Sequence, residues 1–210
     1  MGHVVLLGDS IFDNAAYVAG GPDVRAQVQA CLPHSWRATL LAVGGSRMLD
    51  VLAQLRQLPP DASHLVISVG GNDALDHLDF LTAPAQSVAE ALDGLAAMAE
   101  AFEGAYHRLV QAALQHALPT TLCTIYYPCF PVPDVRRRAV TALAVFNDAI
   151  IREALTAGVP LCDLRLICTA EADYANPIEP SVVGGAKIAA AIARAVCEPA
   201  CTRGRPHVFI

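Results

Sequence analysis

The stretch His3-Val4-Val5-Leu6-Leu7-Gly8-Asp9-Ser10, near the start of the 210-residue chain, decides the fold. Its uninterrupted valine and leucine residues predict a buried strand over His3–Leu7, and glycine and small polar residues follow the strand at once. Similar short apolar runs alternate with longer, alanine-rich stretches of helical period. We predict strands at His3–Leu7, Arg37–Val43, Leu65–Val69, Thr120–Ile125 and Val159–Leu161, and helices at Val24–Cys31, Met48–Leu58, Ser87–His116, Pro133–Thr156 and Ser181–Cys197.

This alternation is typical of βαβ units, in which parallel strands are joined by right-handed helical crossovers. The sequence therefore predicts an α/β protein, a three-layer α/β/α sandwich whose five-stranded parallel sheet has the order 2-1-3-4-5. No internal repeat or linker divides the chain. We expect a single domain over residues 1–198 and a C-terminal tail over 199–210.

Composition excludes several classes of protein. Hydrophobic residues make up 54% of the chain, which is too many for a disordered protein, and 14 basic against 20 acidic residues give a net charge of −6. We therefore expect neither nucleic acid nor membrane as a partner. The start of the chain has no basic segment or long apolar run, and the seven cysteines contain no CxxC pair, so we predict a cytoplasmic protein with reduced thiols. Cys197 and Cys201 lack partners at zinc spacing, and no metal or cofactor is predicted.

Ligands of such a sheet bind where the strands end, so the residues after each strand are the candidate site. Ser10 follows the first strand, Gly45 the second and Asn72 the third. A serine hydroxyl, a glycine N–H and an asparagine amide are the parts of an acyl-transfer site, a nucleophile with two donors for an oxyanion. Each residue alone also fits a plain role in a turn or a helix cap.

The sequence resembles the GDSL or SGNH hydrolases in three blocks, which occur in the order and spacing of that family. The blocks are Gly8-Asp9-Ser10-Ile11-Phe12-Asp13-Asn14, Val43-Gly44-Gly45-Ser46 and Val69-Gly70-Gly71-Asn72-Asp73. The resemblance spans nearly the whole chain. It implies a flavodoxin-like sandwich that hydrolyses esters or thioesters without a metal, with Ser10 as nucleophile and with Gly45, rather than the adjacent Gly44, and Asn72 as oxyanion donors.

The fourth block departs from the family pattern, Asp-x-x-His-Pro. The chain reads Asn176-Pro177-Ile178-Glu179-Pro180, so Glu179 stands where the family has its histidine base and Asn176 where it has the aspartate. A carboxylate with the usual pKa of about 4.3 is a poor base at neutral pH unless burial raises that pKa. An asparagine amide can orient a glutamate by donating a hydrogen bond, whereas an aspartate would repel it. We therefore expect a Ser10–Glu179 pair, supported by Asn176, that works more slowly or at more acidic pH than a serine–histidine enzyme.

Two alternatives remain open. His77, which follows the third block closely, could serve as the base in place of Glu179. The chain could also be a non-catalytic binding domain that keeps the fold and has lost its base. Gly-x-Ser-x-Gly, Gly-x-Gly-x-x-Gly and Walker spacings are missing, which disfavours an α/β-hydrolase elbow or a nucleotide site. Bound FMN is a further possibility for this sheet order, and a visible absorption spectrum would test it.

The expected partner is a small-molecule ester. The loop 126–133 offers three aromatic residues and three prolines, which suit an apolar wall for an acyl chain or a sugar face. We place Asp13, Asn14 and residues 20–22 on the opposite wall, and we expect a short acyl group. The sequence leaves the oligomeric state open.

Overall fold

The computed structural model describes residues 1–197 and 207–210, so residues 199–206 of the predicted tail, with Cys201, lie outside the described residues. The sheet is parallel throughout, in the order β2-β1-β3-β4-β5-β8. Its strands are β1 His3–Gly8, β2 Arg37–Leu40, β3 His64–Ser68, β4 Thr120–Cys123, β5 Leu161–Cys162 and β8 Val208–Phe209. The predicted sheet and strand order are confirmed. A sixth strand, β8, is added beside β5, with Phe209 buried.

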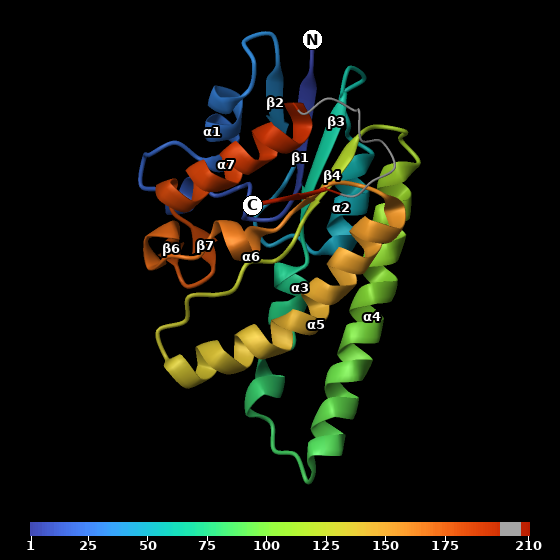
Figure 1. Ribbon diagram of the computed structural model, residues 1–210, viewed down its shortest axis with the longest axis vertical. Helices are drawn as coiled ribbons and strands as arrows, with labels where there is room; N and C mark the ends of the chain where they lie inside the picture. Colours follow the sequence, from blue (N-terminus) through green and yellow to red (C-terminus); the bar gives the residue numbers. More distant parts are fainter. Residues whose placement is uncertain (198–206) are drawn as a thin grey trace.

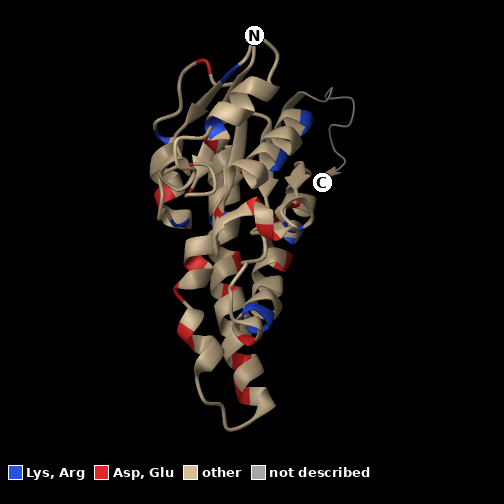
Figure 2. Cartoon of the chain, turned by 90° about the vertical axis from the view of Figure 1, so that its left-hand side faces the viewer, with Lys and Arg blue, Asp and Glu red and all other residues tan. Residues whose placement is uncertain are grey.

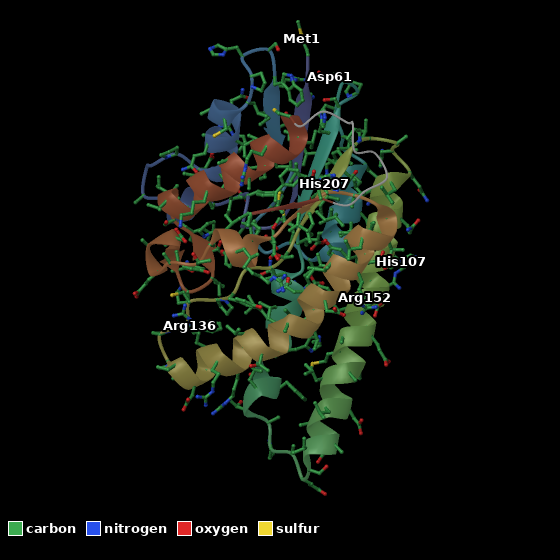
Figure 3. All side chains as sticks on the ribbon, in the orientation of Figure 1. Met1, Asp61, His107, Arg136, Arg152 and His207 are labelled. Carbon is green, nitrogen blue, oxygen red and sulfur yellow. The ribbon has the colours of Figure 1, made fainter. Side chains whose placement is uncertain are left out.

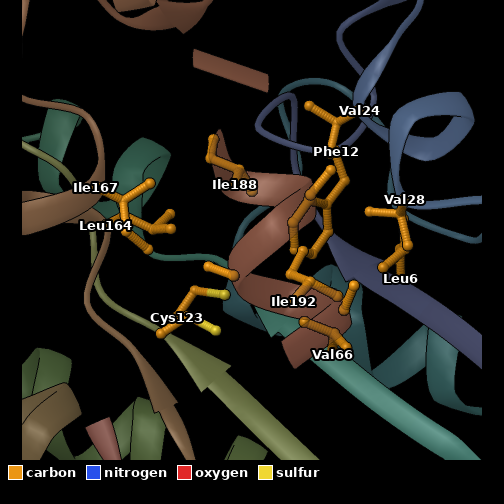
Figure 4. Close-up of a cluster of buried hydrophobic side chains, with 14 of the residues drawn as sticks. Leu6, Phe12, Val24, Val28, Val66, Cys123, Leu164, Ile167, Ile188 and Ile192 are labelled. Carbon is orange, nitrogen blue, oxygen red and sulfur yellow. The ribbon is translucent and has the colours of Figure 1, made fainter. Parts of the chain in front are cut away.

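Helices cover both faces of the sheet (Figure 1). The long helices are α1 Val24–Cys31, α2 Met48–Leu55, α4 Val88–Leu114, α5 Pro133–Ala157 and α7 Val182–Cys197. Alternate side chains of β1 point to opposite faces. Val4 and Leu6 pack with α1 and α7 in one core cluster, shown in Figure 4, while Val5 and Leu7 pack with α2, α4 and α5 in the other.

Local sequence explains where these helices begin and end. Asp23 and Ser87 cap α1 and α4 by accepting hydrogen bonds from Ala26 and Glu90 N–H groups. Pro133 starts α5, and Gly158, with a φ of 66°, ends it in the left-handed conformation that glycine favours. These helices lie within a few residues of the predicted ranges.

The segments predicted as loops contain short elements that periodicity does not reveal. They are α3 Gly71–Leu75, α6 Leu164–Ile167, the 3₁₀ turns η1 Ala15–Tyr17, η2 Leu78–Thr82 and η3 Glu171–Asp173, and the hairpin of β6 Tyr174–Asn176 with β7 Glu179–Pro180. The second strand also ends earlier than predicted. The N–H groups of Leu41 and Ala42 both donate to Leu6 O, so the chain leaves the regular ladder there.

Candidate active site

Ser10 lies just beyond the end of β1, at the carboxyl edge of the sheet. Gly8 has a φ of +131°, and a Cβ atom there would lie 1.7 Å from Ser68 O. Only glycine therefore fits this close contact between the ends of β1 and β3. Gln54 of α2 holds the same residue from both sides, because its amide accepts from Gly8 N–H and donates to Gly8 O, each at 2.8 Å. The backbone that presents Ser10 is therefore tightly constrained.

The Ser10 hydroxyl donates a hydrogen bond to Glu179 Oε1 at 2.8 Å. Both residues are buried, with exposed fractions of 8% and 5%. The second carboxylate oxygen of Glu179, Oε2, has no hydrogen-bond partner in the described part of the chain. Two residues separated by 169 positions in sequence thus form a hydroxyl–carboxylate pair that is largely shielded from solvent.

Burial determines the acid–base character of this pair. Desolvation raises the pKa of Glu179, the hydrogen bond from Ser10 lowers it, and the charge of Asp13 raises it further. Asp9, beside Ser10, is fully buried, and burial raises its pKa to about 7, against a hydrogen bond from Ile11 N–H and with the help of the Glu179 charge. Both carboxyl groups are therefore more basic than usual, as a general base at neutral pH requires.

Asn72 and Gly44 lie near Ser10, while Gly45 follows Gly44 in the chain and is not among the residues that line the pocket. Asn72 lines the same pocket as Ser10, and its amide donates one hydrogen bond to Ser46 O at 2.9 Å. The Gly44 N–H donates to Asp13 Oδ2 at 2.9 Å, and a Cβ atom on Gly44 would lie 3.9 Å from Ser10 Cβ. Gly45 has a φ of +81°, and its N–H makes no hydrogen bond within the described ranges. The hydrogen bond to Ser46 O fixes the orientation of the Asn72 amide, which keeps a second N–H hydrogen to donate.

Asn176 lies opposite Glu179 in the β6–β7 hairpin. Its side-chain oxygen accepts a hydrogen bond from Ile178 N–H at 3.0 Å, which closes the turn between the two strands. Among the residues that the structure describes, no hydrogen bond joins Asn176 to the Glu179 carboxylate. The geometry of Asn176 is therefore that of a residue that shapes the turn carrying Glu179.

Two residues hold the β6–β7 hairpin in place, and the sequence did not predict this role for either of them. The Tyr126 hydroxyl donates to Ile178 O at 2.7 Å. Asn14, fully buried, donates to Pro180 O at 3.2 Å and accepts from Val24 N–H at 2.8 Å. These bonds tie the residues on either side of Glu179 to the loops after β4 and β1. Nothing in the local sequence distinguishes Asn14 from an ordinary loop asparagine.

A pocket of about 930 Å³, including the space at its mouth, opens beside Ser10 and Glu179. Of the predicted apolar wall, Tyr126, Pro128 and Phe130 line it. His77 also lines it, from an exposed position between α3 and η2. The opposite wall was predicted incorrectly: Asp13, Asn14 and residues 20–22 are not among the lining residues, and α4 and α5 provide that side instead.

The described residues contain no group of three or more His, Cys, Asp or Glu side chains arranged to hold a metal ion. In residues 1–197 and 207–210, no helix combines the length and the apolar character that crossing a membrane requires.

Comparisons with solved structures agree with this fold. Solved structures with the same fold include an extracellular lipase from Streptomyces rimosus, with 21% identity, a TM-score of 0.66 and coverage of 89% of this chain and 96% of that one. A phospholipase A1 from Streptomyces albidoflavus NA297 has 17% identity, a TM-score of 0.65 and coverage of 89% and 95%. The esterase EstA from Pseudoalteromonas sp., in a structure inhibited by monoethylphosphonate, has 16% identity, a TM-score of 0.60 and coverage of 93% and 97%.

No curated protein sequence matches the chain. The sequence profile of the GDSL-like lipase/acylhydrolase family matches residues 6–184, a range that begins in β1, ends in α7 and includes Ser10, Asn72 and Glu179. The chain belongs to the GDSL-like lipase/acylhydrolase family.

Proposed function

We propose that the protein is a serine hydrolase that cleaves a carboxylic ester through an acyl-serine intermediate, with Glu179 as the base. The observation that carries the proposal is the 2.8 Å hydrogen bond from Ser10 Oγ to Glu179 Oε1, at the mouth of the pocket. A nucleophile within hydrogen-bond reach of its base is the minimum arrangement for covalent catalysis.

In the first half of the reaction, Ser10 Oγ attacks the ester carbonyl carbon while its proton passes to Glu179. The amide of Asn72 and the N–H of Gly45 donate to the oxyanion that forms. When the tetrahedral intermediate collapses, the C–O bond to the alcohol breaks, and protonated Glu179 returns its proton to the leaving oxygen. Water then attacks the acyl-serine by the same route, which releases the acid and restores Ser10.

Gly45 is the better supported of the two glycines, because the N–H of Gly44 is already bound to Asp13. Asn176 acts indirectly in this scheme, since its side chain closes the turn that presents Glu179. The small-molecule ester stays the proposed partner. The short acyl group and the cytoplasmic location stay predictions from the sequence.

Covalent labelling tests the proposal. A fluorophosphonate reacts with activated serines, so intact mass should show one adduct on the wild type and none on Ser10→Ala. Glu179→Gln keeps the shape of the side chain and removes the base, and we expect it to label at least about 100-fold more slowly. Ser35→Ala, an exposed serine far from the pocket in sequence, is the control and should label like the wild type.

Other results would point to the alternatives. If Glu179→Gln labels as fast as the wild type, another base serves Ser10, and His77→Ala would then be tested. An unlabelled but folded wild type would contradict the enzyme and favour the non-catalytic binding domain.

A further inference from the structure

The pocket beside Ser10 continues away from the sheet, between α4, α5 and η2. Four residues of α5 line it, Ala139, Ala142, Leu143 and Phe146, at the i, i+3, i+4 and i+7 positions of one helix face. Leu95 and Met98 line it from α4 at i and i+3. The space is therefore a slot that follows two turns of α5 and has apolar walls on both sides.

The sheet covers only part of the apolar inner faces of these two helices. Figure 1 shows α4 and α5 extending well beyond the carboxyl ends of the strands. All the buried residues of α4 lie in its second half, from Phe102 onward. Leu95 and Met98 precede them and are only partly covered. Met98 also packs against the edge of the core cluster, whereas Leu95 is not part of it, and the slot is the surface that the two side chains share.

The 3₁₀ turn η2 closes the slot at the end far from the sheet. The Phe80 ring packs on Gly94 of α4, where a Cβ atom would lie 2.8 Å from the ring. Arg138 of α5 donates to Leu81 O at 3.4 Å. These two contacts connect η2 with both helices, so the slot has a roof as well as two walls.

We propose that this slot binds the acyl chain of a medium-chain fatty acyl ester, an inference that rests on the proposed function of Ser10. The slot begins at Ser10, where the ester carbonyl must lie, and its walls along α4 and α5 are aliphatic or aromatic. Beyond the serine, His77 is a lining side chain that can hydrogen-bond, and it stands at an exposed position. Walls with so few hydrogen-bonding groups suit a hydrocarbon chain better than a sugar or a nucleotide.

The length of the slot sets the length of the chain. From Ala139 to Phe146 the helix rises about 10 Å, at about 1.5 Å per residue. An extended hydrocarbon with C–C bonds of about 1.5 Å advances roughly 1.25 Å per carbon. The slot therefore accommodates an acyl chain of about eight carbons, longer than the short acyl group predicted from the sequence.

A series of p-nitrophenyl esters tests this inference. Each methylene that enters the slot should raise kcat/KM about fourfold, up to an acyl chain of about eight carbons, after which the increase should stop. Ala142→Phe fills the slot and should lower the octanoate-to-acetate ratio of kcat/KM at least tenfold. Ala144→Phe is the matched control, because Ala144 lies on the same helix, is exposed and does not line the pocket. It should leave the ratio unchanged.

A second variant acts in the opposite direction. Leu95→Ala removes volume at the far end of the slot, from a side chain that is only partly buried. It should raise the dodecanoate-to-octanoate ratio of kcat/KM. A wild type that hydrolyses acetate and octanoate esters equally well, with ratios that neither variant changes, would overturn the slot while leaving the proposed hydrolase intact.

The binding of an unreactive ligand distinguishes the proposed slot from the proposed hydrolase activity. Octanamide is a neutral probe, which avoids repulsion by Glu179 and Asp9, and calorimetry can measure its binding to Ser10→Ala. We expect binding that Ala142→Phe weakens at least tenfold and Ala144→Phe does not. This result would support the slot even if Ser10 took no label. Absence of octanamide binding to Ser10→Ala would count against the slot whatever the labelling result.

Discussion

At the scale of single residues, the site depends on how burial changes two carboxyl groups. Glu179 accepts from the Ser10 hydroxyl, and Asp9 precedes that serine in the chain. Desolvation raises the pKa of both groups, and for Asp9 the result is about 7. Under the proposed mechanism Glu179 acts as the base, and its burial, which raises its pKa, makes it a stronger base than an exposed glutamate.

Asp9→Asn should make the protein more stable at neutral and higher pH. The folded-state pKa of Asp9, about 7, is above its ordinary value of 3.8, so the folded wild type retains a proton that the unfolded chain has lost. Its contribution to stability is fully present below about pH 4 and is lost as the pH rises through about 7. We expect the variant to gain as much as about 4 kcal/mol over the wild type at pH 8 and almost nothing at pH 4.

Urea unfolding at pH 4, 6 and 8 measures this difference. Asp79→Asn, an exposed aspartate in η2, is the control and should change the free energy of unfolding little at any pH. A gain for Asp9→Asn that is the same at all three pH values would show that the Asp9 carboxyl group does not titrate near 7 in the folded state.

The sequence predicts the pair of Ser10 and Glu179, but it does not predict the residues that hold Glu179 in position. Ser10 and Glu179 are found from block spacing, because each follows a recognisable pattern at the end of a strand or before a helix. Asn14 and Tyr126 hold the Glu179 hairpin through backbone carbonyl groups of residues far away in the chain. Such contacts depend on tertiary packing, so a single sequence gives no local indication of them.

At the scale of elements, regular periodicity was a good predictor and short elements were missed. The five strands and the five long helices are close to their predicted ranges, since their apolar residues recur over several turns or along a buried run. By contrast, α3, η2 and the β6–β7 hairpin have two to five residues per element. These short elements carry Asn72, the roof of the slot and Glu179, so the missed elements are the ones that shape the site.

Helix α7 shows how a glycine can position one of these short elements. A Cβ atom on Gly184 would lie 2.1 Å from Asp173 O, so glycine allows the first turn of α7 to contact η3. The same carbonyl accepts from Ser181 N–H at 2.9 Å, and the Asp173 carboxylate pairs with Lys187 Nζ at 2.7 Å. A shift of the Asp173 carbonyl would move Ser181, which is bound to it, and with Ser181 also Glu179, two residues earlier in the chain.

Gly184→Ala should therefore destabilise the fold by about 1–3 kcal/mol and slow fluorophosphonate labelling of Ser10. Gly104→Ala in α4 is the contrast. A Cβ atom there meets only the end of the Arg108 side chain, at 3.6 Å, so the higher helix propensity of alanine should stabilise the protein by up to about 1 kcal/mol. Thermal unfolding and labelling rates of both variants test this. Equal effects of the two changes would show that the contact between α7 and η3 is unimportant.

At the scale of the whole molecule, two parts differ in what stabilises them. The sheet and its helices enclose two buried clusters, while the ends of α4 and α5 project beyond them (Figure 1). Acidic residues lie along the projecting helices in Figure 2, and α4 alone carries Glu90, Asp93, Glu100 and Glu103.

Polar contacts join the two long helices nearer the sheet. Arg152 forms an ion pair with Glu103 at 2.6 Å, and His107 Nδ1 lies 3.0 Å from Glu153 Oε2; Figure 3 shows Arg152 and His107 on neighbouring parts of α5 and α4. Exposed pairs of this kind contribute little each, so apolar burial is the main difference between the halves of α4.

Hydrogen exchange should show this difference along a single helix. Opening the first half of α4, residues 92–100, exposes no fully buried side chain, whereas opening residues 103–114 exposes Tyr106, Leu109, Val110 and Ala113. We expect amides of the first half to exchange at least about tenfold faster.

Helix α5 is the control, because its buried residues run from Ala139 to Ala154, so its protection should change more gradually. Octanamide bound in the slot should slow exchange in the first half of α4 selectively, since it would add an apolar contact to Leu95 and Met98. Uniform protection along α4 without the probe would mean that the helix opens as one unit, and its projecting half would then owe its order to something other than local burial.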